Sequence, residues 1–442
     1  LIMLAGIYYG AMYGGSTTSI LVNIPGEAAS VVTCIDGYRM ARAGRAGAAL
    51  GMSAFGSFFG GTVSVVAVML ISPFLAETAL KFGAPEMFAL LFFAFTCIGG
   101  LTGKSRGRGL LMACVGLLLG TVGTDDIQGV DRFVFGTLYL RDGIGLVPLA
   151  MGLFGMGEVL YNIEKRERAG SVLETPKSLL PTWQDWKDST GPMLRGSALG
   201  FGIGVLPGGM PAVASLLSYA VEKRVARRPE RFGRGAIEGV AGPETANNAA
   251  TAGGFVPLLT LGIPTNSVLA LMLAAMMLHG VTPGPLLLLK WPDVFWGVIA
   301  SMYLGNAMLL VLNLPMIGLF VQILKVPYAI LSPLIVMFVL LGAYALNNSV
   351  TDVLATVLFG IAGYLMKRFN IEPAPLVLAF VLGPMLENNL SKALIMARGD
   401  AVPFFFGRPI AATLLALAGL VLLYPLVRAG WRWAAKGRFA QG

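Results

Sequence analysis

Charged residues are scarce in this 442-residue chain: Asp, Glu, Lys and Arg together make up 12% of it, whereas roughly 25% is usual for a soluble domain. So few charges cannot cover a surface that faces water. Hydrophobic residues, by contrast, make up 56% of the chain. The shortage of charge therefore excludes an ordinary soluble domain and indicates a membrane protein.

Histidine and cysteine are scarce as well. His279 is the only histidine, which leaves almost no material for a zinc centre or a histidine-based catalytic triad. Cys34, Cys97 and Cys114 are odd in number and widely spaced, which predicts neither a disulfide framework nor a metal site. We therefore expect a protein that is not an enzyme and has no cofactor.

The chain is basic, with 32 Lys and Arg against 23 Asp and Glu and a net charge of +9. These bases lie in short loops between apolar stretches. That placement is the positive-inside pattern of a membrane protein, not the footprint of a nucleic-acid binder. We therefore expect the lipid bilayer as a partner and no nucleic acid.

Long apolar stretches are what the chain has in abundance. Each approaches the ~20 residues that a helix needs to cross the hydrocarbon core, and shorter stretches bring the total to roughly ten passes. The runs show no strand alternation, so the fold predicted is an all-α polytopic transmembrane protein. The clearest stretches are residues 50–71, 87–101, 294–314 and 329–346.

Two related halves are predicted, a first transmembrane repeat at residues 1–165 and a second at 195–442, joined by a polar cytoplasmic linker at 166–194. Asn-Ile-Pro-Gly at 23–26 and Gly-Ile-Pro-Thr at 262–265 each end an apolar segment. The counterpart of the Leu-Pro-Gly-Gly sequence in the second half would precede residue 1, so we expect the N-terminal part of the first repeat to be missing.

Charge placement predicts that the two repeats are inverted. The loop after the first motif is basic, with Arg39, Arg42 and Arg45, while residues 281–284 after the second motif are neutral. Opposite charge bias at equivalent places indicates opposite orientation in the membrane. The basic C-terminal segment disagrees with this pattern and leaves the side of that end open.

Glycine and proline interrupt apolar helices in both halves and free backbone groups that lipid cannot satisfy. Such breaks are tolerated at a buried or wet site, where hydroxyl and amide groups can bind an anion or a small cation. Close helix packing through small residues is the alternative reading. The candidate substrate-binding residues are Gly14, Gly15, Ser16, Thr17, Asn23, Pro25 and Gly26 in the first half and Pro207, Gly208, Gly209, Asn247, Asn248, Thr260, Pro264, Thr265 and Asn266 in the second.

Two further features bear on this predicted site of broken helices or re-entrant hairpins. A sodium ion is expected near Asn23, Asn247 and Asn248. Glu244 is the nearest carboxylate, and it fits equally well as an intramembrane functional acid or as an interfacial residue at a helix start.

At these residues the sequence resembles the large membrane subunit of the tripartite tricarboxylate transporters, the TctA type. Residues 8–18 (YYGAMYGGSTT), 23–30 (NIPGEAAS) and 36–38 (DGY) carry the resemblance in the first half. Residues 235–241 (GAIEGVA), 246–250 (ANNAA) and 257–264 (PLLTLGIP) carry it in the second. Met210-Pro211 and Thr265-Asn266-Ser267 depart from the family's usual pattern.

The resemblance implies a multi-pass protein of the bacterial inner membrane that imports di- or tricarboxylates such as citrate by ion-coupled symport. It also implies a small four-helix membrane subunit and a periplasmic binding protein as partners. We expect sodium as the coupling ion and the two motifs meeting near the bilayer midplane. The alternatives are a cation/proton antiporter, a membrane-embedded lipid-processing enzyme, and a membrane subunit that transports nothing alone.

Overall fold

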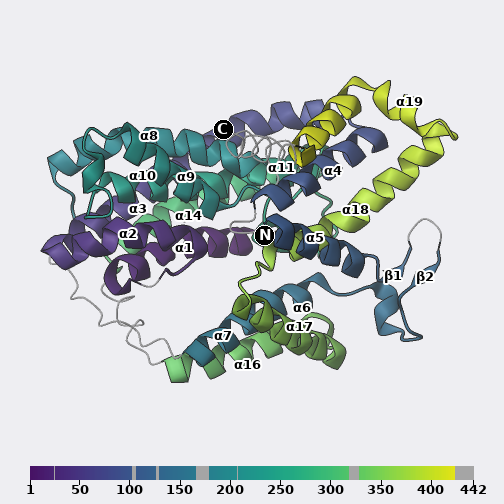
Figure 1. Ribbon diagram of the computed structural model, residues 1–442, viewed down its shortest axis with the longest axis horizontal. Coiled ribbons are helices and arrows are strands. Elements are labelled where there is room, and N and C mark those ends of the chain that lie inside the picture. The colour runs from purple at the N-terminus through teal and green to yellow at the C-terminus, as the bar shows by residue number, and fades with distance from the viewer. Residues whose placement is uncertain are drawn as a thin grey trace, which may run out of the picture. The chain divides into compact units, whose positions relative to one another are not determined.

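The structure is a computed structural model, and it describes residues 1–23, 25–101, 106–125, 129–165, 179–206, 208–317 and 328–423. Helices make up almost all of it (Figure 1). The prediction of an all-α polytopic membrane protein is confirmed, while the inversion of the repeats stays a prediction.

The helices and strands follow one another in a simple order. The first part of the chain contains α1 (Ile2–Val22), η1 (Ala28–Ser30), α2 (Val31–Met40), η2 (Ala41–Arg45), α3 (Ala46–Ala79), α4 (Ala84–Leu101), α5 (Arg106–Gly120), β1 (Gly123–Thr124), β2 (Asp131–Arg132), η3 (Tyr139–Asp142), α6 (Leu146–Ala150), η4 (Met151–Met156) and α7 (Gly157–Lys165). The rest contains α8 (Trp183–Val205), α9 (Pro211–Val225), η5 (Pro229–Arg231), α10 (Glu238–Gly253), α11 (Phe255–Leu261), α12 (Ser267–Leu278), α13 (Leu287–Lys290), α14 (Pro292–Asn313), α16 (Tyr328–Asn347), α17 (Val350–Arg368), α18 (Ala374–Ala397) and α19 (Ala401–Phe406).

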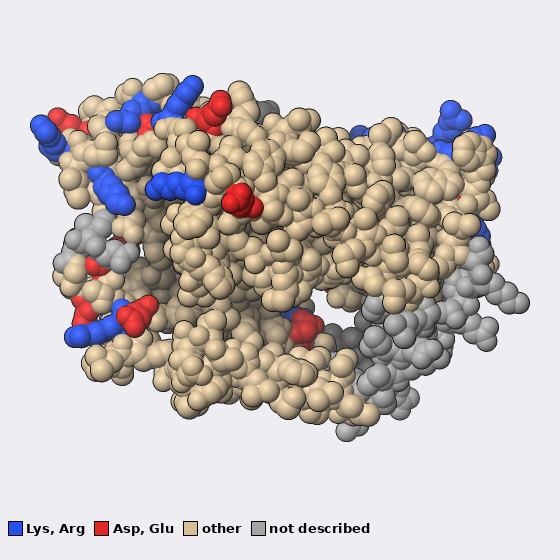
Figure 2. Space-filling view, turned by 180° about the vertical axis from the view of Figure 1, so that it is seen from behind, with Lys and Arg blue, Asp and Glu red and all other residues tan. Residues whose placement is uncertain are grey.

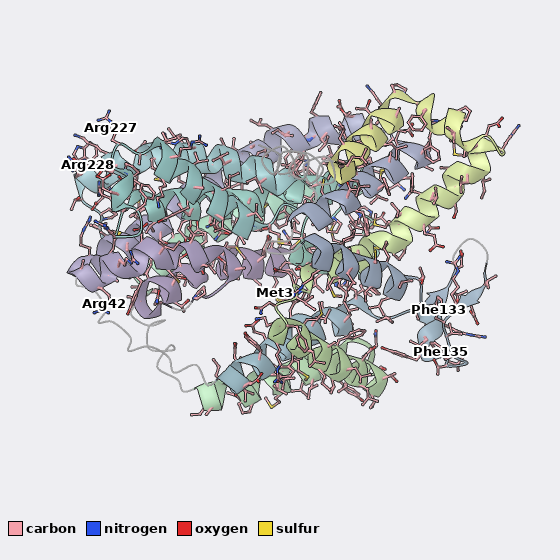
Figure 3. All side chains as sticks on the ribbon, viewed as in Figure 1. Met3, Arg42, Phe133, Phe135, Arg227 and Arg228 are labelled. Carbon is pink, nitrogen blue, oxygen red and sulfur yellow. The ribbon has the colours of Figure 1, made fainter. Side chains whose placement is uncertain are left out.

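Five helical segments within the described residues are long and apolar enough to span a membrane: Ala28–Ala79, Leu146–Glu164, Pro292–Asn313, Ala329–Asn347 and Val350–Arg368. Shorter apolar helices at Ala84–Cys97, Gly107–Gly120, Ser267–Leu278 and Pro409–Leu423 suit a chain whose passes are interrupted by glycine and proline. Most of the surface shown in Figure 2 carries no charged side chain. Arg42, Arg227 and Arg228 extend from one end of the α1, α2, α8 and α9 bundle (Figure 3).

The chain forms two compact units that are interleaved in sequence. The first comprises the described residues of Leu1–Ala79 and Ala150–Tyr364, and the second those of Leu80–Leu149 and Leu365–Gly442. This division differs from the two predicted repeats, whose boundaries stay a prediction. Within the predicted linker, residues 183–194 form the first turns of α8, and residues 166–178 lie outside the described part of the chain.

In the second unit, α18 packs against α4 and α5. Gly116 of α5 permits this, because a Cβ there would lie 2.1 Å from the carbonyl oxygen of Leu376. The only paired strands in the described residues, β1 and β2, form an antiparallel pair. Arg132 of β2 pairs with both Asp125 and Glu387.

The first unit is built around α10, which contacts α1, α2, α3, α8 and α9. The loop that leads into α10 is fixed by Asp36 of α2, a fully buried carboxylate. It accepts hydrogen bonds from the backbone N–H groups of Gly233, Gly235 and Ala236 at 2.7–3.0 Å and from the hydroxyl of Tyr219 at 2.9 Å. Because charge-assisted bonds of this kind are strong, Asp36 sets where α10 begins.

Candidate functional site

The helix α10 lies in the interior of the first unit, and every residue from Gly239 to Gly253 is buried. Its sequence of glycine, alanine and small polar residues lets neighbouring helices come close. Gly200 and Gly204 of α8 lie so near to α10 that a Cβ at either would be 2.2 Å from the carbonyl oxygen of Ala246 or Ala250. Gly60 of α3 likewise approaches the backbone of Thr245, where a Cβ would lie 2.3 Å from the carbonyl oxygen.

Glu244 lies near the middle of α10, fully buried, and hydroxyl groups from three other helices donate to its carboxylate. Ser16 of α1 donates to Oε2 at 2.5 Å, and Thr33 of α2 donates to Oε1. Ser57 of α3 is a weaker donor to Oε2 at 3.5 Å. Because burying a carboxylate without partners is very costly, these hydroxyls are what makes its position tolerable. Of the two predictions made for Glu244, the one that places it at an interfacial helix start is wrong.

Glu27, which follows the first helix break, contacts α10 one turn beyond Glu244. The side-chain amide of Asn247 donates to Oε1 of Glu27 at 3.2 Å. Glu27 also accepts from the backbone N–H of Ala29 at 2.6 Å and so caps η1. Residues 244, 247 and 248 share one face of α10 by their helical spacing.

Several oxygen atoms on α10 have no hydrogen-bond partner within the described residues. They are Oδ1 of Asn247, Oδ1 of Asn248 and Oγ1 of Thr245, all buried. Neutral amide and hydroxyl oxygens are ligands that hard cations accept. The described residues contain no group of three or more His, Cys, Asp or Glu that could hold a metal ion, so any cation here would rely mainly on neutral oxygens and backbone carbonyls.

The first break is a tight reversal of the chain. Asn23 ends α1 in the left-handed conformation with φ 58°, and its side chain is exposed. The chain then returns until the N–H of Gly26 donates to the carbonyl of Gly15 at 3.4 Å. A Cβ at Gly26 would lie 2.5 Å from the Cα of Gly15, so glycine is required there.

The second half contains two breaks. Gly208 (φ 76°) and Gly209 join the antiparallel helices α8 and α9, and Pro207 lies outside the described residues. Gly262 (φ 70°) ends α11, and Pro264, Thr265 and Asn266 are buried behind it. Asn266 caps α12 and donates to the hydroxyl of Tyr8 at 2.9 Å.

The structure therefore brings part of the predicted site together. Ser16 meets Glu244, Asn247 meets Glu27, and Asn266 meets α1 through Tyr8. By contrast, the side chains of Thr260 and Asn248 donate to carbonyls of their own helices. Four predicted residues, Gly14, Asn23, Pro25 and Gly26, are exposed. Thr17 is partly buried, and Gly15 packs at the reversal.

Sequence reasoning missed the residues that surround Glu244. Thr33 lies in a helix of mixed composition and Ser57 is one of four serines in α3, so neither residue stands out by its spacing. Glu27 lies within the NIPGEAAS motif of the first half, directly after the helix break, and that position could have identified it as a site residue.

Helix α1 runs antiparallel to α10, because Ser16 meets Glu244 while the ring of Tyr8 lies 6.4 Å from that of Phe255.

These features define a polytopic helical membrane protein whose interior holds a polar centre built at interrupted helices. Within that class, the chain belongs to the tripartite tricarboxylate transporter TctA family, whose model matches residues 1–378. The match includes every candidate site residue.

Two curated relatives are similar over long stretches. An uncharacterized 52.8 kDa protein in the TAR-I ttuC' 3' region of Agrobacterium vitis is 51% identical over 431 residues, which are 97% of this chain and 86% of that protein. An uncharacterized protein in the TAR-II ttuC' 3' region of the same organism is 55% identical over 219 residues, 50% of this chain and 90% of that protein. No solved structure matches the chain.

Proposed function

We propose that this membrane subunit imports a di- or tricarboxylate such as citrate across the bacterial inner membrane, driven by sodium symport. Membership of a tripartite transporter family supports partners of two kinds. These are a small four-helix membrane subunit and a periplasmic binding protein that delivers the substrate.

The observation that carries the ion-coupling proposal is the composition of the cluster around Glu244. A buried carboxylate and unpartnered amide and hydroxyl oxygens lie on one short helix, and among the described residues no lysine or arginine pairs with Glu244 or Glu27. An anionic substrate would be repelled from such a place. A sodium ion held by the oxygens offsets that repulsion, which makes substrate binding depend on the cation and so couples the two.

The test is sodium-driven uptake of labelled citrate by the protein reconstituted with its two partners. Glu244→Gln and Asn247→Ala are each expected to lower the initial rate at least about tenfold, because each removes an interaction at the buried cluster. Glu230→Gln, a loss of negative charge on the exposed loop after α9, is the matched control and leaves uptake unchanged. Full uptake by correctly folded Glu244→Gln and Asn247→Ala proteins would exclude this cluster as the site.

The same buried carboxylate also suits a second function, exchange of a cation for a proton. An assay without the organic anion distinguishes this exchange from carboxylate symport. Sodium-dependent proton movement that persists without any carboxylate and without the binding protein would favour the antiporter, whereas movement that requires the carboxylate supports symport.

A further inference from the structure

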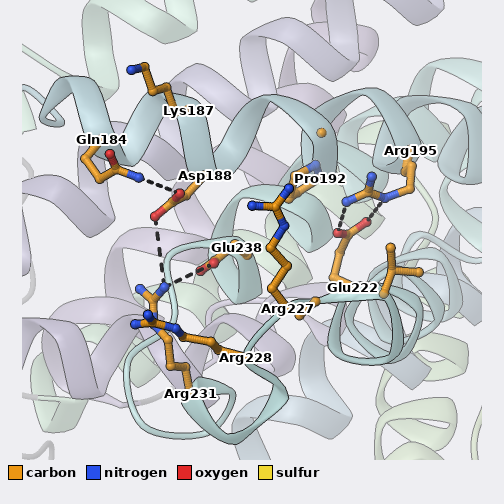
Figure 4. Close-up of a pocket in the computed structure, with 13 residues that line it drawn as sticks. Gln184, Lys187, Asp188, Pro192, Arg195, Glu222, Arg227, Arg228, Arg231 and Glu238 are labelled. Atoms are coloured by element: carbon orange, nitrogen blue, oxygen red, sulfur yellow. Dashed lines mark hydrogen bonds and ion pairs between the residues drawn. The ribbon is translucent and has the colours of Figure 1, made fainter.

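A cavity of about 900 Å³ lies in the first unit between the N-terminal half of α8, the C-terminal end of α9, the loop that follows it and the start of α10 (Figure 4). Five cationic and three acidic side chains line it. None of them belongs to the cluster around Glu244. The cavity is therefore a separate place at which charge is concentrated.

Its acidic side chains are already paired. Arg195 holds the buried Glu222 through two hydrogen bonds, at 2.9 Å and 2.5 Å. Arg231 lies 3.4 Å from Glu238 and 4.0 Å from Asp188. Arg195 and Arg231 thus pair with all three carboxylates of the cavity. The other cationic side chains that line it have no acidic partner within the cavity.

Arg227 and Arg228 are those remaining arginines. Both are exposed, and neither forms an ion pair with a described residue. Figure 4 shows both guanidinium groups among the lining side chains without an interaction drawn to either. Lys187, the fifth cation, lies over the ring of Trp183 at 5.8 Å. A planar guanidinium group with free N–H donors is well suited to phosphate, which it can bind through two parallel hydrogen bonds.

Apolar side chains near these cations indicate which kind of phosphate-bearing ligand the cavity suits. Val225 lines the cavity with 56% of its surface exposed. Leu194 does not line the cavity, but it precedes Arg195 on α8 and is 57% exposed. The volume lies in the range of roughly 300–1,000 Å³ that holds a small molecule. Basic pockets at the ends of transmembrane helices suit anionic headgroups, because the phosphate meets the cations while the acyl chains stay on the apolar surface. We propose that this cavity binds the phosphate of an acidic phospholipid headgroup, a role independent of the transport proposal.

The experiment measures lipid binding to the delipidated full-length protein in detergent, by displacement of a labelled phosphatidylglycerol. Arg227→Gln/Arg228→Gln is expected to weaken phosphatidylglycerol binding at least about tenfold, since each basic residue near a lipid phosphate adds on the order of a fivefold gain in affinity. Lys223→Gln/Arg224→Gln removes the same charge from exposed residues of α9 that do not line the cavity. This control is expected to keep affinity within about threefold.

Two comparisons of ligand complete the test. Phosphatidylcholine, which carries the same phosphate without net charge, should compete weakly. Glycerol phosphate should also compete weakly, because it lacks the acyl chains. Equal losses in the two double variants would mean that the charge acts diffusely and would overturn the site. Displacement by glycerol phosphate as effective as by the lipid would overturn the lipid assignment. Melting temperatures of all variants confirm that binding is compared between folded proteins.

Discussion

At the scale of single residues, the site combines residues whose interior placement could be predicted from the composition with residues whose placement could not. Ser16, Asn247 and Asn248 are polar residues in an apolar chain, so their interior placement could be predicted. The partners of Glu244 could not, because Thr33 and Ser57 reach it from helices that only tertiary packing brings together. Asn23 shows the converse. Its motif predicted the turn correctly, but the structure leaves its side chain exposed.

Asn23 allows a test of what its side chain contributes to that turn. Its backbone is left-handed, a conformation that asparagine and glycine tolerate and alanine does not. Asn23→Ala is therefore expected to lower the free energy of unfolding by about 1 kcal/mol, and Asn23→Gly by clearly less. Thermal or denaturant unfolding in detergent measures the difference. Equal stability of the two variants would show that the turn does not depend on this conformation.

At the scale of elements, α10 is positioned by glycines of α8 and α3. Small residues in apolar helices indicate close helix packing in general, but the sequence alone singled out no glycine of α8 or α3. Which glycines form the contacts could not be predicted, because that depends on how each helix is rotated. Gly200 and Gly204 face α10 closely, whereas Gly202, between them, has no atom within 4 Å of the place where a Cβ would be.

This difference gives a matched pair of substitutions. Gly200→Ala is expected to lower the free energy of unfolding by roughly 1–3 kcal/mol, because the added methyl group forces two helix backbones apart. Gly202→Ala adds the same methyl group on an exposed face and is expected to raise it by up to about 1 kcal/mol, since alanine favours the helix. Melting temperatures of the purified variants would decide between them. If Gly200→Ala were as stable as the parent, α8 and α10 would not be in close contact.

At the scale of the whole molecule, the sequence predicted an all-helical polytopic protein, and the interleaving of the two compact units could not be foreseen. That interleaving depends on contacts between segments more than 200 residues apart, such as Ser16 with Glu244. Within the first unit, the end of the predicted linker ties early and late segments together. The carbonyl of Leu179 packs on Gly51, and Asp185 of α8 pairs with Arg45.

Asp185 makes this connection dependent on pH. Burial opposes its ionisation, but hydrogen bonds from Arg45 and Thr182 outweigh burial and lower the pKa of Asp185 below its ordinary value. Because the folded pKa is lower than the unfolded one, protonation favours the unfolded chain. The stabilisation is therefore complete at neutral pH and is lost as the pH falls through about 3.9 toward the folded value.

Asp185→Asn is accordingly expected to cost about 1 kcal/mol at pH 7 and progressively less as the pH approaches 3. Melting temperatures of the parent and the variant across this range measure the change. Asp188→Asn, one turn further along α8 and 4.0 Å from Arg231, is the control. A gap between parent and Asp185→Asn that stays constant with pH would contradict the role given to the carboxylate.

The buried position of α10 has a consequence for biogenesis. Its 16 residues include two glutamates and two asparagines, and each charged residue near the centre of a helix costs roughly 2.5–3.5 kcal/mol during insertion by the translocon. Alone, this segment is not expected to enter a bilayer. It requires α3 and α8 to be present first, so the polar centre is completed only after those helices have been inserted. In a glycosylation-mapping assay, α10 should therefore integrate when α3 and α8 precede it and fail to integrate as an isolated segment.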